Sequence, residues 1–134
     1  MKKVLIDTDT LSLFLRNQSQ VMNSARNYLS YHPGFTFSVV THFEILRGLK
    51  VKDAQAQLKK FKGIRELSTE VNLSTAIVNT AADIYSTFYR AGTIIGDADI
   101  LIAATAMELG LELVTNNTAH FTRIDGLEVR NWNA

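Results

Sequence analysis

The chain has 134 residues, of which 46% are hydrophobic and 20% charged, and this composition excludes a disordered protein and predicts a single domain over residues 1–134. The absence of cysteine excludes disulfides, thiolate zinc sites and cysteine nucleophiles, and it fits a reducing compartment. The net charge of +1 neither favours nor excludes a nucleic-acid partner.

The N-terminus and the longest apolar run argue against export and membrane insertion. Only Val4–Ile6 separate the basic start from Asp7, which is too short for the apolar core of a signal peptide. The largely apolar run Ile100–Met107 is too short to cross a bilayer. We therefore expect a soluble, cytoplasmic protein that does not contact membranes.

In chain order, short apolar runs alternate with segments that have helical periodicity. Such alternation favours an α/β sandwich in which helices cover both faces of a mainly parallel central sheet. The predicted elements are a strand over Lys3–Ile6, a helix ending at Arg16, a helix over Ser19–Ser30, a strand over Phe35–Val40, helices over Thr41–Gly48 and Asp53–Lys62, a short strand over Arg65–Ser68, helices over Leu73–Gly92 and Asp97–Glu108, a strand over Glu112–Thr115 and an edge strand within Leu127–Trp132.

Two of these helices carry further signals. Thr41 and Glu44 have the spacing of a capping box, which predicts that their helix begins at Thr41. The helix over Asp53–Lys62 has only a narrow apolar stripe, and we expect it to lie on the surface and to stop at Gly63.

Half of the basic residues lie in one short stretch of the chain. This stretch is either a solvated helix face or a surface that contacts phosphates. Its members are Arg47, Lys50, Lys52, Lys59, Lys60, Lys62 and Arg65.

Acidic residues occur at three separate places that a parallel sheet brings together. Asp7 and Asp9 follow the first strand, Glu44 lies one turn into the helix after the second strand, and Asp97 and Asp99 begin the helix before the last core strand. Ligands of open parallel sheets bind beyond the carboxyl ends of the strands. We expect these acids to meet at that edge.

Each acid also has a purely structural interpretation. Asp9 or Asp97 is explained by an N-cap or by the helix dipole, and Glu44 by its capping box. Asp7 resists this interpretation, because a carboxylate that ends an apolar strand is partly desolvated without a partner.

Taken together, the acids predict a metal site. Converging carboxylates repel one another and raise one another's pKa unless a cation neutralises them. Oxygen ligands without His or Cys suit Mg²⁺ or Mn²⁺, and such an ion can activate water and stabilise the leaving oxygen of a phosphodiester. The chemistry indicated is phosphodiester hydrolysis.

The same residues resemble the PIN-domain family, in particular the VapC-like toxins of toxin–antitoxin pairs. Four motifs match in order from Lys3 to about Trp132, and a Phe and a glycine turn follow them at Phe121 and Gly126. The motifs are Leu5-Ile6-Asp7-Thr8-Asp9, Ser38-Val39-Val40-Thr41-His42-Phe43-Glu44-Ile45-Leu46-Arg47-Gly48, Asp99-Ile100-Leu101-Ile102-Ala103-Ala104 and Val114-Thr115-Asn116-Asn117.

The resemblance implies a PIN-like three-layer fold and a role for each acid. Asp7 and Asp99 would bind Mg²⁺ or Mn²⁺ directly, Glu44 would bind the metal or its water, and Asp97 would be an accessory catalytic acid. Asp9 departs from the Asn that is common in the family and either adds charge or caps a helix.

The chain departs from the family a second time after its last core strand. Asn117 stands where many members carry a fourth acid, which puts a second metal in doubt. The resemblance further implies an endoribonuclease toxin that is a homodimer, is held inactive by a small antitoxin, and cuts structured RNA such as tRNA.

Two other functions compete with the nuclease. A haloacid-dehalogenase-type phosphatase is suggested by Asp7-Thr8-Asp9-Thr10, but Leu11 stands where that family has Thr or Val. A non-catalytic PIN-like binding module is the second competitor, although Asp7, Glu44 and Asp99 are all retained.

Several aromatic and histidine residues receive structural interpretations. We expect His120 to be a surface or capping residue and Trp132 to cover a sheet edge. Tyr85, Phe88 and Tyr89 belong to the core or to a dimer surface.

Overall fold

The computed structural model describes all residues 1–134, and in most of the chain two helices separate one strand from the next. None of its helices combines the length and apolar character needed to cross a membrane. The elements are β1 (Val4–Ile6), α1 (Thr8–Leu15), α2 (Ser19–Leu29), β2 (Thr36–Ser38), α3 (Val39–Val51), α4 (Gln55–Leu67), β3 (Thr69–Val71), α5 (Thr75–Arg90), α6 (Asp97–Leu109), β4 (Glu112–Val114), α7 (Thr118–Phe121) and β5 (Val129–Arg130).

The strands pair only in parallel. One sheet has the order β1-β4-β5, with Leu5 opposite Leu113, and β2 pairs separately with β3. The strand expected within Leu127–Trp132 is β5, and it lies at the edge as predicted. Because β1 and β4 run in the same direction, the residues that follow them lie at one edge of the sheet.

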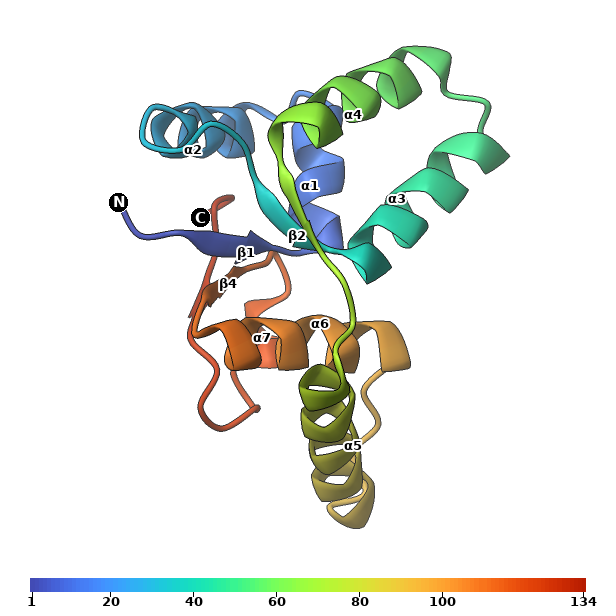
Figure 1. The fold of residues 1–134 in the computed structure, drawn as a ribbon, viewed down its shortest axis with the longest axis vertical. Coiled ribbons are helices and arrows are strands. Elements are labelled where there is room, and N and C mark those ends of the chain that lie inside the picture. Colours follow the sequence, from blue (N-terminus) through green and yellow to red (C-terminus); the bar gives the residue numbers. More distant parts are fainter.

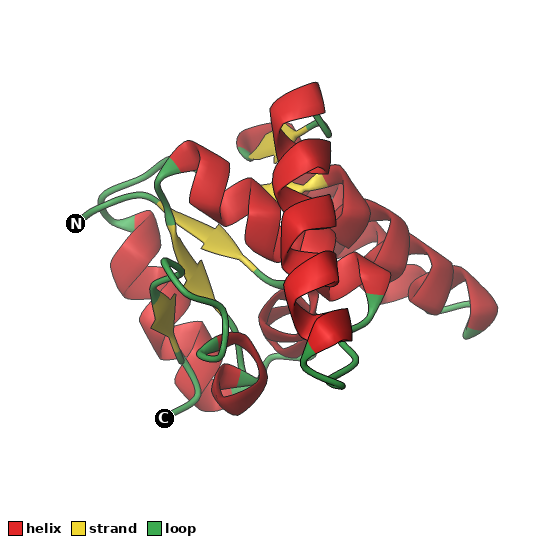
Figure 2. Cartoon of the chain, turned by 90° about the horizontal axis from the view of Figure 1, so that it is seen from below, coloured by secondary structure: helices red, strands yellow, loops and turns green.

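Helices cover both faces of this sheet, which confirms the expected three-layer arrangement. Helices α1 to α4 lie on one side of β1 and β4, and α5 to α7 lie on the other (Figure 1). Figure 2 shows the short strands enclosed between these helices. Side chains alternate accordingly: Val4 and Ile6 pack with the first group of helices, and Leu5 packs with the second.

Helix α3 begins earlier and ends later than predicted. Ser38 is its N-cap and accepts a hydrogen bond from the Val40 N–H, so Thr41 is an interior residue and the predicted capping box is wrong. The apolar run predicted as a strand to Val40 ends at Ser38, because this hydroxyl satisfies a free N–H of the first helical turn. The helix also continues past Gly48 to Val51.

Helix α4 lies on the surface as predicted but has different ends. Only Phe61 is fully buried, and the helix runs through Gly63 to Leu67, so the strand predicted over Arg65–Ser68 is wrong. A helical glycine costs about 1 kcal/mol relative to alanine, which the neighbouring turns can offset. The strand forms instead at Thr69–Val71 and pairs with β2.

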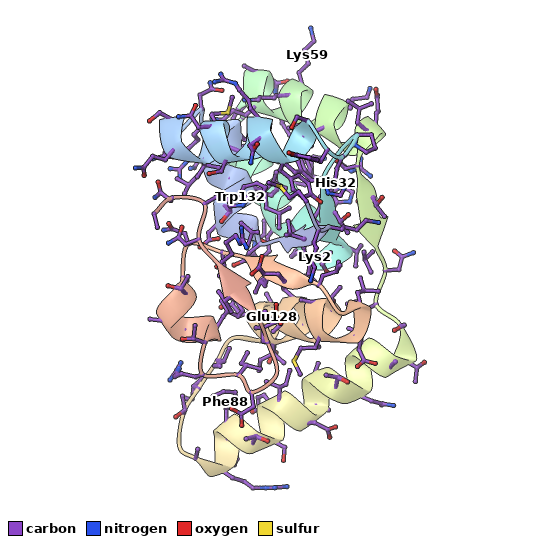
Figure 3. All side chains as sticks on the ribbon, turned by 90° about the vertical axis from the view of Figure 1, so that its left-hand side faces the viewer. Lys2, His32, Lys59, Phe88, Glu128 and Trp132 are labelled. Atoms are coloured by element: carbon purple, nitrogen blue, oxygen red, sulfur yellow. The ribbon has the colours of Figure 1, made fainter.

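The aromatic residues near the C-terminus are structural. Trp132 is buried and its ring lies 5.6 Å from that of Tyr28 and 6.2 Å from that of Phe35. This packing confirms that Trp132 covers the sheet next to its edge strand, and Figure 3 shows it on the side of the sheet where α2 lies.

Candidate active site

Asp7 is held at the end of β1 by its own backbone. Its N–H donates to the Val114 carbonyl at 2.8 Å, which continues the β1–β4 pairing by one residue. Its side chain accepts one hydrogen bond from the Thr8 N–H and one from the Thr115 hydroxyl, both at 2.8 Å. Asp7 is 4% exposed, so the burial expected from the sequence is confirmed.

This environment raises the pKa of Asp7 from 3.8 to about 7. Burial is the largest cause, the charge of Asp9 adds to it, and that of Asp99 contributes less. The hydrogen bonds from Thr115 and Thr8 act in the opposite direction, because they stabilise the carboxylate. The charged form of Asp7 is therefore unfavourable without a cation.

Asp9 connects α1 to the segment after β4. Both of its carboxylate oxygens lie 3.2 Å from the Asn116 N–H, and the Thr115 hydroxyl is 3.4 Å from one of them. The N-cap of α1 is Asp7, so the interpretation of Asp9 as a cap is wrong. Its charge instead lies among the site acids.

Glu44 reaches the site through threonine hydroxyls. The Thr8 hydroxyl donates to Glu44 Oε1 at 2.7 Å and lies 3.0 Å from the Thr41 hydroxyl. Arg47, one turn along α3, lies 3.7 Å from the other carboxylate oxygen. Because Ser38 caps α3, the capping interpretation no longer explains Glu44.

Asp99 lies in the first turn of α6, next to His120 of α7. His120 Nε2 is 3.3 Å from Asp99 Oδ2, close enough for an ion pair but not aligned as a regular hydrogen bond. Burial raises the pKa of Asp99, the charges of Glu44 and Asp9 also raise it, and His120 lowers it. Four carboxylates thus influence one another at one edge of the sheet.

Asp97 is separated from this group. It is an exposed residue at the start of α6, whose N-cap is Gly96, so Asp97 does not cap the helix with its side chain. It is also absent from the lining of the cavity that contains the other acids. The structure brings together Asp7, Asp9, Glu44 and Asp99, and it does not bring Asp97 with them.

The acids open into a cavity of about 410 Å³ between α1 and α3. These helices start beside each other near the end of β1 (Figure 1). Asn117 lines the same cavity, at the place where the resemblance would put a fourth acid. A larger hollow of about 1030 Å³ lies beside the N-terminus and Trp132, but the Glu112 at its wall is paired with Arg130.

The donor set fits a hydrated hard cation. No three His, Asp or Glu side chains lie close enough to enclose an ion directly, so the set of Asp7, Glu44 and Asp99 as ligands stays a prediction. Mg²⁺ commonly binds one or two carboxylates and keeps several waters. The buried Asp7, with its raised pKa and its neighbouring acids, is the observation that favours such an ion.

Sequence reasoning missed the residues that orient the acids. Thr8 and Thr115 lie inside the quoted motifs, directly beside Asp7 and after β4, but their hydrogen bonds depend on the folded positions. His120, expected to be a surface or capping residue, lies beside Asp99 because the unpredicted helix α7 places it there.

The chain matches the model of the PIN domain over residues 4–127. It is 29% identical to ribonuclease VapC1 of Methanocaldococcus jannaschii over 122 residues, which covers 91% of this chain and 81% of that protein. It is 28% identical to the tRNA(fMet)-specific endonuclease VapC of Shigella flexneri, with 98% and 99% of the two chains covered. The solved DNA-bound VapBC from Salmonella typhimurium matches with a TM-score of 0.85 and 26% identity, covering 98% of this chain and 99% of that chain. The expected family is confirmed, and this chain belongs to the PIN-domain family as a VapC-like member.

Proposed function

We propose that this chain is a Mg²⁺- or Mn²⁺-dependent endoribonuclease, the toxin of a toxin–antitoxin pair. The observation that carries the proposal is the group of four carboxylates, Asp7, Asp9, Glu44 and Asp99, in which Asp9 and Asp99 raise the pKa of the buried Asp7 and Glu44 and Asp9 raise that of Asp99. PIN-domain nucleases are typically metal-dependent, and the relatives named above are ribonucleases. A buried carboxylate that is this unfavourable without a cation favours a site that binds one.

The metal would be held by Asp7 and Asp99, and Glu44 would contact it directly or through a water. When bound, it would lower the pKa of a water and neutralise charge on the phosphate. The protein contributes orientation: Thr8 and Thr115 hold Asp7, and Thr8 also holds Glu44. Glu44 would then direct the attacking water toward the phosphorus atom.

The other polar residues would have smaller roles. Asp9 adds negative charge beside Asp7, and His120 orients Asp99. With Asn117 at the cavity wall in place of an acid, we expect one well-formed metal site. Asp97 remains only an accessory acid in this proposal, because it is exposed and lies outside the cavity.

The relatives suggest the substrate and the partners. We infer that the chain acts in the cytoplasm on a structured RNA such as a tRNA, as the name of the Shigella relative states for that protein. A small antitoxin would keep it inactive, as in the VapBC pairs. For the expected homodimer, α5 offers the exposed residues Tyr85 and Tyr89, whose rings stack at 6.0 Å.

The two alternatives make different predictions. The match to the PIN domain over most of the chain argues against a phosphatase of the haloacid-dehalogenase type. A non-catalytic PIN-like module would not need the intact acidic group. It would gain support if the purified chain left every RNA uncut in Mg²⁺ and in Mn²⁺.

The test compares the native chain with Asp99→Asn and with Asp83→Asn, a control that removes an exposed acid on α5 that does not line the cavity. Each form is expressed without antitoxin, and RNA ends are mapped. We expect the native chain and the Asp83 control to arrest growth and cut RNA, and Asp99→Asn to lose at least about 10²-fold in cleavage rate. Equal arrest by all three forms would contradict the nuclease.

A further inference from the structure

The active-site cavity has a basic end as well as an acidic one. Thr8 of α1 and Glu44 of α3 lie at the acidic end. The cavity is also lined by Arg16 and Lys52, which lie eight positions later and directly follow the last residues of α1 and α3. Eight residues of α-helix span about 12 Å. The backbone positions of the acidic and the basic end are therefore about 12 Å apart along each helix.

Arg16 and Lys52 are free to bind a ligand. Both are exposed, and neither forms an ion pair within the protein. Each follows the last residue of its helix, where the helix dipole favours a cation, so this placement alone does not identify a site. The second observation is that two such cations, from two different helices, line the same cavity as the acids.

Three other basic residues of the stretch Arg47–Arg65 have partners within the protein, and one of them, Arg47, lies 3.7 Å from Glu44. Arg65 lies 3.4 Å from Glu70. Lys60 donates to the Phe14 carbonyl at 3.2 Å and to Asn17 Oδ1 at 2.7 Å, where it satisfies the end of α1. Lys59 extends away from the body of the protein into solvent (Figure 3). Within this stretch, Lys52 is the unpaired cation that lines the cavity.

Resting on the proposed nuclease function, we propose that Arg16 and Lys52 bind an RNA phosphate next to the scissile one. A guanidinium can bind two phosphate oxygens at once, and an ammonium adds a point charge. The uncharged Gln57 of α4 lines the same end and offers a further donor. The two cations are positioning residues, because they set the register of the RNA strand over the acids.

The cavity favours a nucleic acid over an acidic peptide. A peptide that brings several carboxylates would have to lay them along a wall that already carries Asp7, Asp9, Glu44 and Asp99. In the proposed site, a divalent ion held by the acids would offset the charge of the scissile phosphate, and the neighbouring phosphate of the RNA strand would contact Arg16 and Lys52.

The experiment compares two double variants with the same loss of charge. Arg16→Gln/Lys52→Gln removes the proposed contacts, and Lys59→Gln/Lys62→Gln removes two α4 lysines that do not line the cavity. All four positions are exposed, so circular dichroism should show unchanged folding for both. Binding to a fluorescein-labelled oligouridylate is measured with Mg²⁺ over a salt series in the Asp99→Asn background, which makes the readout independent of cleavage.

We expect Arg16→Gln/Lys52→Gln to weaken binding at least about ten-fold and to make the salt dependence shallower by about 0.7 per lost phosphate contact. In the cleavage-competent background, KM should rise while kcat changes little, because the contact acts before and during the reaction alike. Lys59→Gln/Lys62→Gln should leave the affinity, its salt dependence, KM and kcat unchanged.

Two results would overturn the proposal. The first is an unchanged affinity and salt slope in Arg16→Gln/Lys52→Gln while the native chain cleaves RNA, which leaves the nuclease intact. The second is unchanged oligouridylate binding with a loss of affinity for an oligoglutamate peptide, which would assign the cations to a protein partner. A native chain that binds the oligouridylate through these cations but cuts no RNA would contradict the nuclease alone.

Discussion

The backbone of Asp7 is fixed by the pairing between β1 and β4, and its carboxyl is held in a buried position by hydrogen bonds from Thr8 and Thr115. Two hydrogen bonds stabilise its charged form, yet burial and the neighbouring acids prevail and hold its pKa at about 7. Ionising Asp7 in the metal-free fold is therefore unfavourable, and its charge develops fully only above about pH 7. Such a cost is typical of residues that are retained for function.

Replacing Asp7 by asparagine should stabilise the metal-free protein above pH 7. A carboxyl with a raised folded-state pKa contributes stability below its unfolded pKa of 3.8, and this contribution is lost as the pH rises through about 7. Asparagine has no such titration. The shift sets an upper limit of about 4 kcal/mol on the gain in unfolding free energy at pH 8.

Urea unfolding of both forms in EDTA measures this difference. At pH 8, Asp7→Asn should be the more stable form, and the gap should narrow steadily as the pH falls toward 4. Added Mg²⁺ should stabilise the native chain and not the variant, and the variant should be inactive. A native chain that gains stability between pH 4 and 8 relative to Asp7→Asn would refute the assignment.

At the scale of elements, one close approach between segments sets where β2 lies. A Cβ placed on Gly34 would lie 1.9 Å from the Leu67 carbonyl oxygen, so the chain before β2 contacts the end of α4 at a distance that only glycine allows. The Thr69 N–H donates to the Phe35 carbonyl immediately afterwards, which joins β2 and β3. Gly34 is thus needed for this pair of strands.

Gly34→Ala should destabilise the protein, and Gly63→Ala should not. The first substitution forces backbone apart and should cost about 2 kcal/mol or more, whereas nothing lies within 4 Å of the position that a Cβ on Gly63 would take. Alanine in the middle of α4 should add up to about 1 kcal/mol. Thermal unfolding of the two variants shows directly whether each substitution raises or lowers the stability. Equal effects from both would contradict the close contact between Gly34 and the end of α4.

The order and type of most elements could be predicted from hydrophobic periodicity, but their ends could not. Helix α3 begins at Val39 because the Ser38 hydroxyl caps it, although Thr41 and Glu44 offer the more familiar pattern. Two caps so close together in sequence compete, and their outcome depends on the tertiary position of Thr41, which is buried beside Thr8.

For the site, the sequence likewise predicted the main residues but not the details of their surroundings. Asp7, Glu44 and Asp99 were expected together, because parallel strands end at one edge. Because residues two positions apart on a helix point about 200° apart, the predicted helix already implied that Asp97 and Asp99 do not both face one cavity, but the sequence does not tell which of them does. The contact of Thr115 with Asp7 depends on the pairing of β1 with β4, and the contact of Thr8 with Glu44 and the positions of Arg16 and Lys52 depend on how α1 and α3 meet, so no local pattern predicts them.

At the scale of the whole molecule, two groups of buried residues share one sheet. Val4 and Ile6 of β1 belong to the core that contains Trp132, and Leu5 belongs to the core that contains Ile102. Because neighbouring residues of the same strand serve both cores, neither core can lose its strand while the other stays folded. This arrangement supports the prediction, made from length and composition, that residues 1–134 form one domain.

A small cavity introduced in the core on one face of the sheet should therefore also lower the stability of the core on the other face. Ile102 is fully buried, and Ile102→Val should lower the unfolding free energy by about 1 kcal/mol. The change should move the transition reported by the fluorescence of Trp132, in the opposite core, as far as it moves the helical circular dichroism. Ile94→Val, at a side chain that is 88% exposed, should move neither. If Ile102→Val shifted the circular dichroism and left the Trp132 transition in place, the two faces would unfold separately and the single-domain prediction would be wrong.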